Sequence, residues 1–131
     1  MAYEEILQSI TFPSSGDMSA NQYFIVRVST AGQVGPTSAR GAAGIGPLQD
    51  NSTATAFSVK IAAYGVSKVA AGDSSAGALI AFWDALVATS AGRAVTSTGT
   101  GLHVIGRALT TLSSGVTGVI SMLITQEGLS S

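Results

Sequence analysis

Residues 57–69 read FSVKIAAYGVSKV, and the order of apolar and polar side chains in this stretch predicts a β-strand. Phe57, Val59 and Ile61 alternate with polar or small residues, which is the period of a strand with one buried face. After Gly65 the alternation resumes in the opposite phase, so we expect two short strands or one strand with a bulge. The stretch therefore indicates a mainly β fold.

Strand-like segments continue on both sides of this stretch. Residues 116–125, VTGVISMLIT, are rich in β-branched side chains and predict a terminal strand, and residues 102–109 predict another. Residues 29–35 and 90–95 each place an Ala-Gly pair before β-prone residues, which is typical of a turn that leads into a strand. Frequent glycine and proline argue against long helices across most of the chain.

The chain also repeats itself in sequence. The first half contains GDMSA, QYFIVRV, TAGQVGPTS and GIGPL in that order, and the second half contains GDSSA, GALIAFW, SAGRAVTS and VIGRAL. The spacing from Gly32 to Gly92 equals the spacing from Gly46 to Gly106, whereas the spacing from Gly16 to Gly72 is four positions shorter. We predict an internal duplication whose second copy holds four extra residues within 85–89.

One segment, residues 78–88 with the sequence ALIAFWDALVA, fits either a strand or an amphipathic helix. Its alanines and leucines favour a helix, whereas the corresponding segment of the first copy, residues 22–28, is strongly β-prone. We therefore predict a strand over residues 78–83 and a helical or looped conformation over residues 85–88.

The N-terminal segment precedes a break at Pro13 that continues as Ser-Ser-Gly. We predict an extended N-terminal arm over residues 1–13 and a single β-barrel domain over residues 14–131, because a chain of this length suffices for one core. The segment either adds a strand to a neighbouring sheet edge or forms the first strand of the chain's own sheet. As an arm it would bind through its apolar residues: Tyr3, Ile6, Leu7, Ile10 and Phe12.

The composition is poor in charge. Charged residues make up 10% of the chain, against about 25% in typical soluble domains, and about half of the residues are Ala, Gly, Ser or Thr. Six basic residues and a net charge of −1 predict no nucleic-acid partner, and the lack of a long uninterrupted apolar run predicts no membrane partner. Two interpretations stay open: a surface that faces other proteins, or a merely Ser/Thr-rich β-protein.

The sequence offers little for chemistry, and we predict no catalytic, cofactor-binding or metal-binding residue. His103 is the lone histidine, and the acidic residues are scattered. Ser74, Asp84 and His103 follow the chain order of a hydrolase triad, but GDSSA lacks the closing glycine of a nucleophile elbow. The glycine-rich residues 41–48 lack the pattern of a phosphate-binding loop, so we interpret them as a bend.

The aromatic residues lie in apolar runs without interleaved basic residues, so they do not suggest a platform for stacking bases. We interpret them as core residues or interface anchors: Tyr23, Phe24, Phe57, Tyr64, Phe82 and Trp83.

Four stretches of the second half, GALIAFWD (77–84), AGRAVTSTGTG (91–101), HVIGRAL (103–109) and VTGVISMLI (116–124), resemble the capsid cement, or head decoration, proteins of tailed bacteriophages. The shared pattern is a Gly-Asp turn, a strand ending in an aromatic residue and Asp, and three further strands. Two features depart from it: residues 85–90 are longer than the expected tight turn, and the N-terminal segment has no family signature.

The resemblance implies a compact β-barrel or β-tulip body that is commonly a homotrimer. It implies a structural protein of the virion, made in the host cytoplasm, that binds the outer surface of the expanded capsid near local threefold axes. There it would bridge neighbouring subunits of the major capsid protein and stabilise the head. The alternative is a self-assembling structural subunit, such as a tail-tube, fibre or pilin-like protein, which could share this composition.

Overall fold

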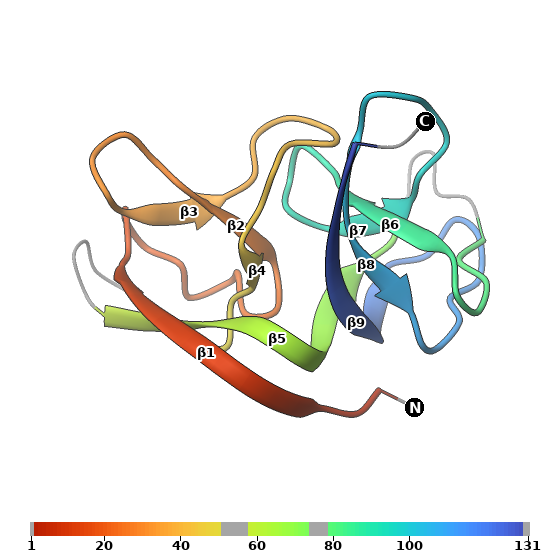
Figure 1. Cartoon of the computed structure of the whole chain (residues 1–131), viewed down its shortest axis with the longest axis horizontal. Coiled ribbons are helices and arrows are strands. Elements are labelled where there is room, and N and C mark those ends of the chain that lie inside the picture. Colours follow the sequence, from red (N-terminus) through yellow and green to blue (C-terminus); the bar gives the residue numbers. More distant parts are fainter. Residues whose placement is uncertain (1, 51–57, 74–78, 130–131) are drawn as a thin grey trace.

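The computed structural model describes residues 2–50, 58–73 and 79–129, and these residues form strands and turns without a helix (Figure 1). The mainly β fold predicted from the sequence is therefore confirmed. The strands are β1 (Glu5–Pro13), β2 (Ile25–Val28), β3 (Val34–Pro36), β4 (Gly46–Pro47), β5 (Ser58–Ala71), β6 (Ala85–Ala88), β7 (Ala94–Thr96), β8 (His103–Ala108) and β9 (Gly118–Leu129).

Strand β5 runs through the middle of the molecule and has two antiparallel partners in succession (Figure 1). Its first part pairs with β1, and from Val66 onward it pairs with β9. Gly65 lies at this change with a left-handed φ of +100°, and Leu7 is an extra residue in β1 opposite it. Ala63 is in turn an extra residue in β5 opposite β1. The expectation of one strand with a bulge near Gly65 is therefore correct, and β1 is bulged as well.

The strands form two sheets. The larger has the order β1-β5-β7-β6-β8-β9, and the additional β5–β9 pairing makes its last five strands ring-like. The smaller has the order β3-β2-β4. Two bridges, Ser14 to Val34 and Leu48 to Ile61, connect the smaller sheet to the β1–β5 pair. We call β1 to β4 with residues 58–65 the first half, and residues 66–71 with β6 to β9 the second half.

The two halves have matching registers. Val26 pairs with Pro36 and Gly46 in the first half, and its counterpart Leu86 pairs with Thr96 and Gly106, so one constant shift in residue number relates both pairings. Outside the strands, the Tyr23 N–H donates to the Leu48 carbonyl at 2.7 Å and the Trp83 N–H donates to the Ala108 carbonyl at 2.7 Å.

The start of each half has a different shift. The Ser15 N–H donates to the Val34 carbonyl and the Gly72 N–H donates to the Ala94 carbonyl, both at 2.9 Å. The sequence separation between the two donors is smaller than the separation between the two acceptors. The same shift in residue number that relates the strand pairings also relates Asn21 to Ala81. The carbonyl of each accepts the N–H of the residue three positions later in the chain. The extra residues of the second half therefore precede Ala81. Their predicted position within 85–89 is wrong, because β6 pairs there in the same register as β2.

The prediction for residues 78–88 is also corrected. Residue 78 lies outside the described residues, and residues 79–84 form a bridge and a turn, whereas Ala85–Ala88 is strand β6. The turn has a physical cause in Asp84, whose carboxylate accepts the Ala81 N–H at 2.8 Å and the Thr96 hydroxyl at 3.1 Å. Trp83 has a left-handed φ of +72°, which ends any extended strand at that point.

The two largest apolar clusters lie mostly in one half each, and Ile25 and Ala62 of the first half belong to the cluster of the second. Leu48, Ile61 and Val26 belong to the cluster of the first half, and Leu86, Met122 and Ile105 belong to that of the second. Ile10 and Phe12 pack against the first cluster, and Ile6 packs against the second. Strand β1 therefore contacts the cores of both halves.

Candidate functional site

The N-terminal segment predicted as an arm is an edge strand of the larger sheet. Three of its five predicted binding residues, Ile6, Ile10 and Phe12, are partly buried against the chain's own core. The other two point away from it, since Tyr3 is 50% and Leu7 76% exposed. The sequence allowed either a strand added to a neighbouring sheet or a first strand of the chain's own sheet. The structure has the second arrangement, because β1 pairs with β5. Contact of this segment with a partner stays a prediction.

The residues before β1 are held in place by hydrogen bonds. The Tyr3 N–H donates to the Ser121 hydroxyl, and that hydroxyl donates to the Tyr3 carbonyl at 2.8 Å. The Glu4 carboxylate accepts the Lys68 N–H at 3.4 Å. The exposed Tyr3 ring is therefore presented from a backbone that is tied to β9.

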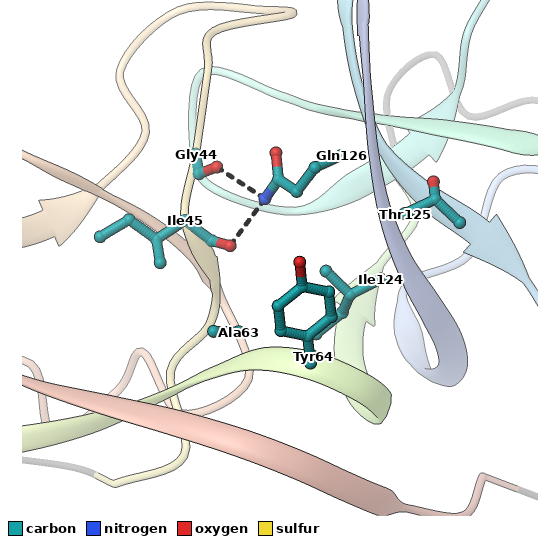
Figure 2. A pocket seen from close by; sticks show the side chains of 7 residues that line it. All are labelled: Gly44, Ile45, Ala63, Tyr64, Ile124, Thr125 and Gln126. Carbon is teal, nitrogen blue, oxygen red and sulfur yellow. Dashed lines mark hydrogen bonds between the residues drawn. The ribbon is translucent and has the colours of Figure 1, made fainter.

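A shallow hollow of about 360 Å³ lies where the two halves meet, and Figure 2 shows the Tyr64 ring of β5 facing it. The Gln126 side-chain amide crosses its upper rim, because its Nε2 donates to the Gly44 carbonyl at 3.0 Å and the Ile45 carbonyl at 2.7 Å. Its lining consists of Gly44, Ile45, Ala63, Tyr64, Ile124, Thr125 and Gln126.

The side-chain amide of Gln126 and the hydroxyl of Thr125 at this hollow are already paired. Gln126 has a left-handed φ of +48°, and its Oε1 lies 2.9 Å from Nε2 of His103. Thr125 donates its hydroxyl to Glu127 at 2.8 Å. Because the lining holds no ionisable group other than the Tyr64 phenol, the hollow suits an apolar group and offers no acid–base pair.

The residues considered for hydrolysis do not assemble in the described part of the chain. Asp84 holds its own turn, and His103 contacts Gln126. Ser74 lies outside the described residues. Within those residues, no group of three or more histidine and acidic side chains could hold a metal ion.

Exposed apolar side chains gather on the turn before β6. Leu79 is 57% exposed, Phe82 66% and Trp83 48%. We call residues 79–84 the aromatic turn. From the sequence, the aromatic residues could be either core residues or interface anchors. The structure exposes Phe82, Trp83 and Tyr64 and half-buries Tyr23 and Phe24, while Phe57 lies outside the described residues.

An ion pair lies beside the aromatic turn. The Arg107 guanidinium donates two hydrogen bonds of 2.8 Å to the Glu127 carboxylate and one of 3.4 Å to the Trp83 carbonyl. Its centre is 5.9 Å from the centroid of the Trp83 ring. Hydrogen bonding to Arg107 lowers the pKa of Glu127, and the same bond raises the pKa of Arg107. Arg107 thus connects the aromatic turn to β9.

Comparison with known proteins supplies no relative. No protein-family model matches the chain, and neither a curated protein nor a solved structure matches it. Over the described ranges, none of the elements is a helix of the length and apolarity that spanning a membrane requires.

Proposed function

We propose that this chain is a non-enzymatic decoration, or cement, protein of a tailed-bacteriophage head. It binds the outer surface of the mature capsid as a homotrimer, bridges neighbouring major capsid protein subunits and stabilises the shell. One observation supports this most strongly. A body with 10% charged residues exposes large apolar side chains on strands and turns that hydrogen bonds hold in place, at Tyr3, Leu7 and Trp83.

The finer description of the fold belongs to the same proposal. We propose that each half is a small barrel-like unit and that the chain arose by duplication of one such unit, giving a β-tulip-like body. The constant shift between the two sets of registers supports this, because unrelated sheets have no reason to repeat each pairing at one shift.

Cementing requires binding without chemistry. Contacts repeated by symmetry multiply a modest affinity at each site. Small side chains lose little rotamer freedom on docking, and an uncharged surface loses little solvation. A surface rich in Ser, Thr, Ala and Gly is suited to that role, and its attachment should depend little on salt.

Strand β1 is the proposed capsid-binding segment. Leu7 of β1 and Tyr3 just before it are exposed and would contact the capsid, whereas Ile6, Ile10 and Phe12 would hold the strand on the body. On this proposal the predicted arm binds as a preordered edge strand, so little entropy is lost when it docks.

The experiment adds the purified protein to expanded heads that lack it and measures the bound copies by sedimentation. We expect saturable binding that persists at about 1 M salt. Replacing Tyr3 and Leu7 together by Ser should weaken it at least about tenfold, whereas Gln8→Ser, an exposed polar control on the same strand, should not. Absence of binding, or release by modest salt, would contradict the proposal. Polymerisation into tubes or fibres would favour the alternative subunit function.

A further inference from the structure

The first half contains a turn with the same backbone as the aromatic turn. Tyr23 has a φ of +70° and Trp83 one of +72°, and both are left-handed at an aromatic residue, which is rare and costs free energy. Phe24 and Asp84 follow them, and each donates its N–H to the residue three positions earlier, at 3.0 and 3.2 Å. We call residues 21–24 the docked turn, because of the contacts that follow.

The docked turn joins the first half to the second. The Tyr23 carbonyl accepts the Ala70 N–H at 2.8 Å, and the Lys68 ammonium lies 5.8 Å from the centroid of its ring. The Arg93 guanidinium lies 4.9 Å from the Phe24 ring centroid. The receiving surface therefore consists of the end of β5 and the tip of the β6–β7 hairpin.

The first half has an equivalent receiving surface, and the tip of its hairpin is exposed. By pairing register, Pro13 at the end of β1 takes the place of Ala70, and Gly32 at the β2–β3 tip takes the place of Gly92. Gly92 is buried, and a Cβ there would lie 3.3 Å from Phe24. Gly32 is exposed, and a Cβ there would meet nothing within 4 Å.

Each chain therefore has one aromatic turn and one receiving surface, and within the described residues neither is docked as the turn at residues 21–24 is. Figure 1 shows the β2–β3 hairpin and the segment before β6 at opposite ends of the long axis. We infer that the aromatic turn of one copy docks on the β1 end and the Gly32 tip of a second copy. The contact between copies would repeat the contact between halves, with Trp83 in the place of Tyr23.

Such an interface is heterologous, so it closes into a ring if the rotation permits and otherwise extends. The inference rests on the homotrimer of the proposed function and names its contact surfaces. Three copies related by a threefold axis would use each turn and each receiving surface once.

The contact between copies differs chemically from the contact within one. Pro13 has no N–H to donate to the Trp83 carbonyl, which accepts from Arg107 instead. Thr11 and Gln33 stand in the places of Lys68 and Arg93, and Asp84 stands in the place of Phe24. The association is therefore weaker than the internal contact, depends on Trp83 burial, and brings Gln33 against Asp84.

The test measures molar mass by sedimentation velocity over a range of protein concentration. We expect the wild type to associate and Trp83→Ser to weaken association at least about tenfold. Gln33→Glu should weaken it through repulsion from Asp84, and Gln33→Arg should strengthen it. Tyr64→Ser removes a more exposed aromatic side chain from the middle of the molecule and should leave association unchanged.

Mixing two variants tests the direction of the contact. Trp83→Ser retains its receiving surface and Gln33→Glu retains its turn, so an equimolar mixture should form hetero-oligomers that neither forms alone. Their thermal unfolding curves check that both are folded. A wild type that stays monomeric, or association insensitive to Trp83 and Gln33, would overturn the inference. Head binding by such a monomer would leave the decoration function standing without its homotrimer, and long filaments sensitive to Trp83 would support the proposed contact but oppose a trimer.

Discussion

The two halves of this molecule share their hydrogen-bond registers but fill their interiors with different side chains. Gly46 and Gly106 occupy equivalent places in the two halves. The residue equivalent to Leu48 of the first half is the buried Ala108 of the second. Where the second half has the larger Leu86, the first has Val26. The difference teaches that close approach of two backbones fixes a residue type, while core volume can be redistributed among neighbours.

The glycines test the shared part of this comparison and have the largest expected effect. A Cβ at Gly46 would lie 1.9 Å from the Ala62 carbonyl oxygen, and one at Gly106 would lie 2.4 Å from that of Leu123. Both partners are backbone atoms of strands, which cannot rotate away. Gly46→Ala and Gly106→Ala should each reduce the free energy of unfolding by about 4 kcal/mol or more.

Chemical denaturation followed by tryptophan fluorescence measures this effect. Gly16→Ala serves as the control, since a Cβ at Gly16 would meet nothing within 4 Å. It should change the unfolding free energy by less than about 1 kcal/mol. A Gly46→Ala protein as stable as the control would show that a side chain fits at this position. Close approach of the backbones would then not explain why both halves have glycine there.

The core leucines test the part that differs. Leu48 and Leu86 are fully buried in separate clusters, so replacing either with Ala should cost about 3 kcal/mol. If the halves are independent cores, the double variant should lose the sum to within about 0.5 kcal/mol. Urea denaturation of both single variants and the double variant measures this. A clearly smaller or larger loss would mean that the halves share one core.

Much of this arrangement is readable from the sequence, because alternation of side chains reports which face of a strand is buried. The phase change at Gly65 predicted the irregularity at which β5 changes partner, and the break at Pro13 predicted the end of the extended segment that forms β1. Both signals are local.

The aromatic turn was not readable in the same way. Residues 79–83 belong to a segment whose alanines and leucines favour a helix, and a strand is predicted there because the corresponding segment of the first copy is β-prone. The Asp84 carboxylate competes with strand pairing by binding the Ala81 N–H, and Trp83 adopts a left-handed φ that propensity does not encode. Whether an aromatic side chain is covered depends on which half docks on it, which no local pattern records.

The two left-handed aromatic residues give a smaller effect. Glycine accepts their backbone conformation without strain, so Tyr23→Gly and Trp83→Gly make the same backbone change and the difference between them reports the side chains. Tyr23→Gly should cost about 1 to 2 kcal/mol, because its half-buried ring contacts Lys68 across the halves. Trp83→Gly, measured by circular dichroism at a concentration where the chain is monomeric, should cost less than about 1 kcal/mol. The reverse order would mean that the aromatic turn, not the docked turn, stabilises the isolated chain.

The ion pair is the smallest difference between the halves. Arg107 pairs with Glu127 in the second half, whereas Pro47 holds the equivalent place in the first. Because the pKa of Glu127 is lowered on folding, the contribution of this pair is present above the ordinary carboxyl pKa. It is lost as the pH falls through the lowered value.

Glu127→Gln should therefore cost less than about 1 kcal/mol at neutral pH, since both partners are partly exposed to water. Unfolding free energies of the wild type and the variant should converge as the pH falls through the lowered pKa of the wild-type Glu127 carboxyl. Added salt should narrow the neutral-pH gap. A gap that widens on acidification would show that Glu127 acts through some contact other than its charge on Arg107, and the asymmetry between Arg107 and Pro47 would then lie in packing.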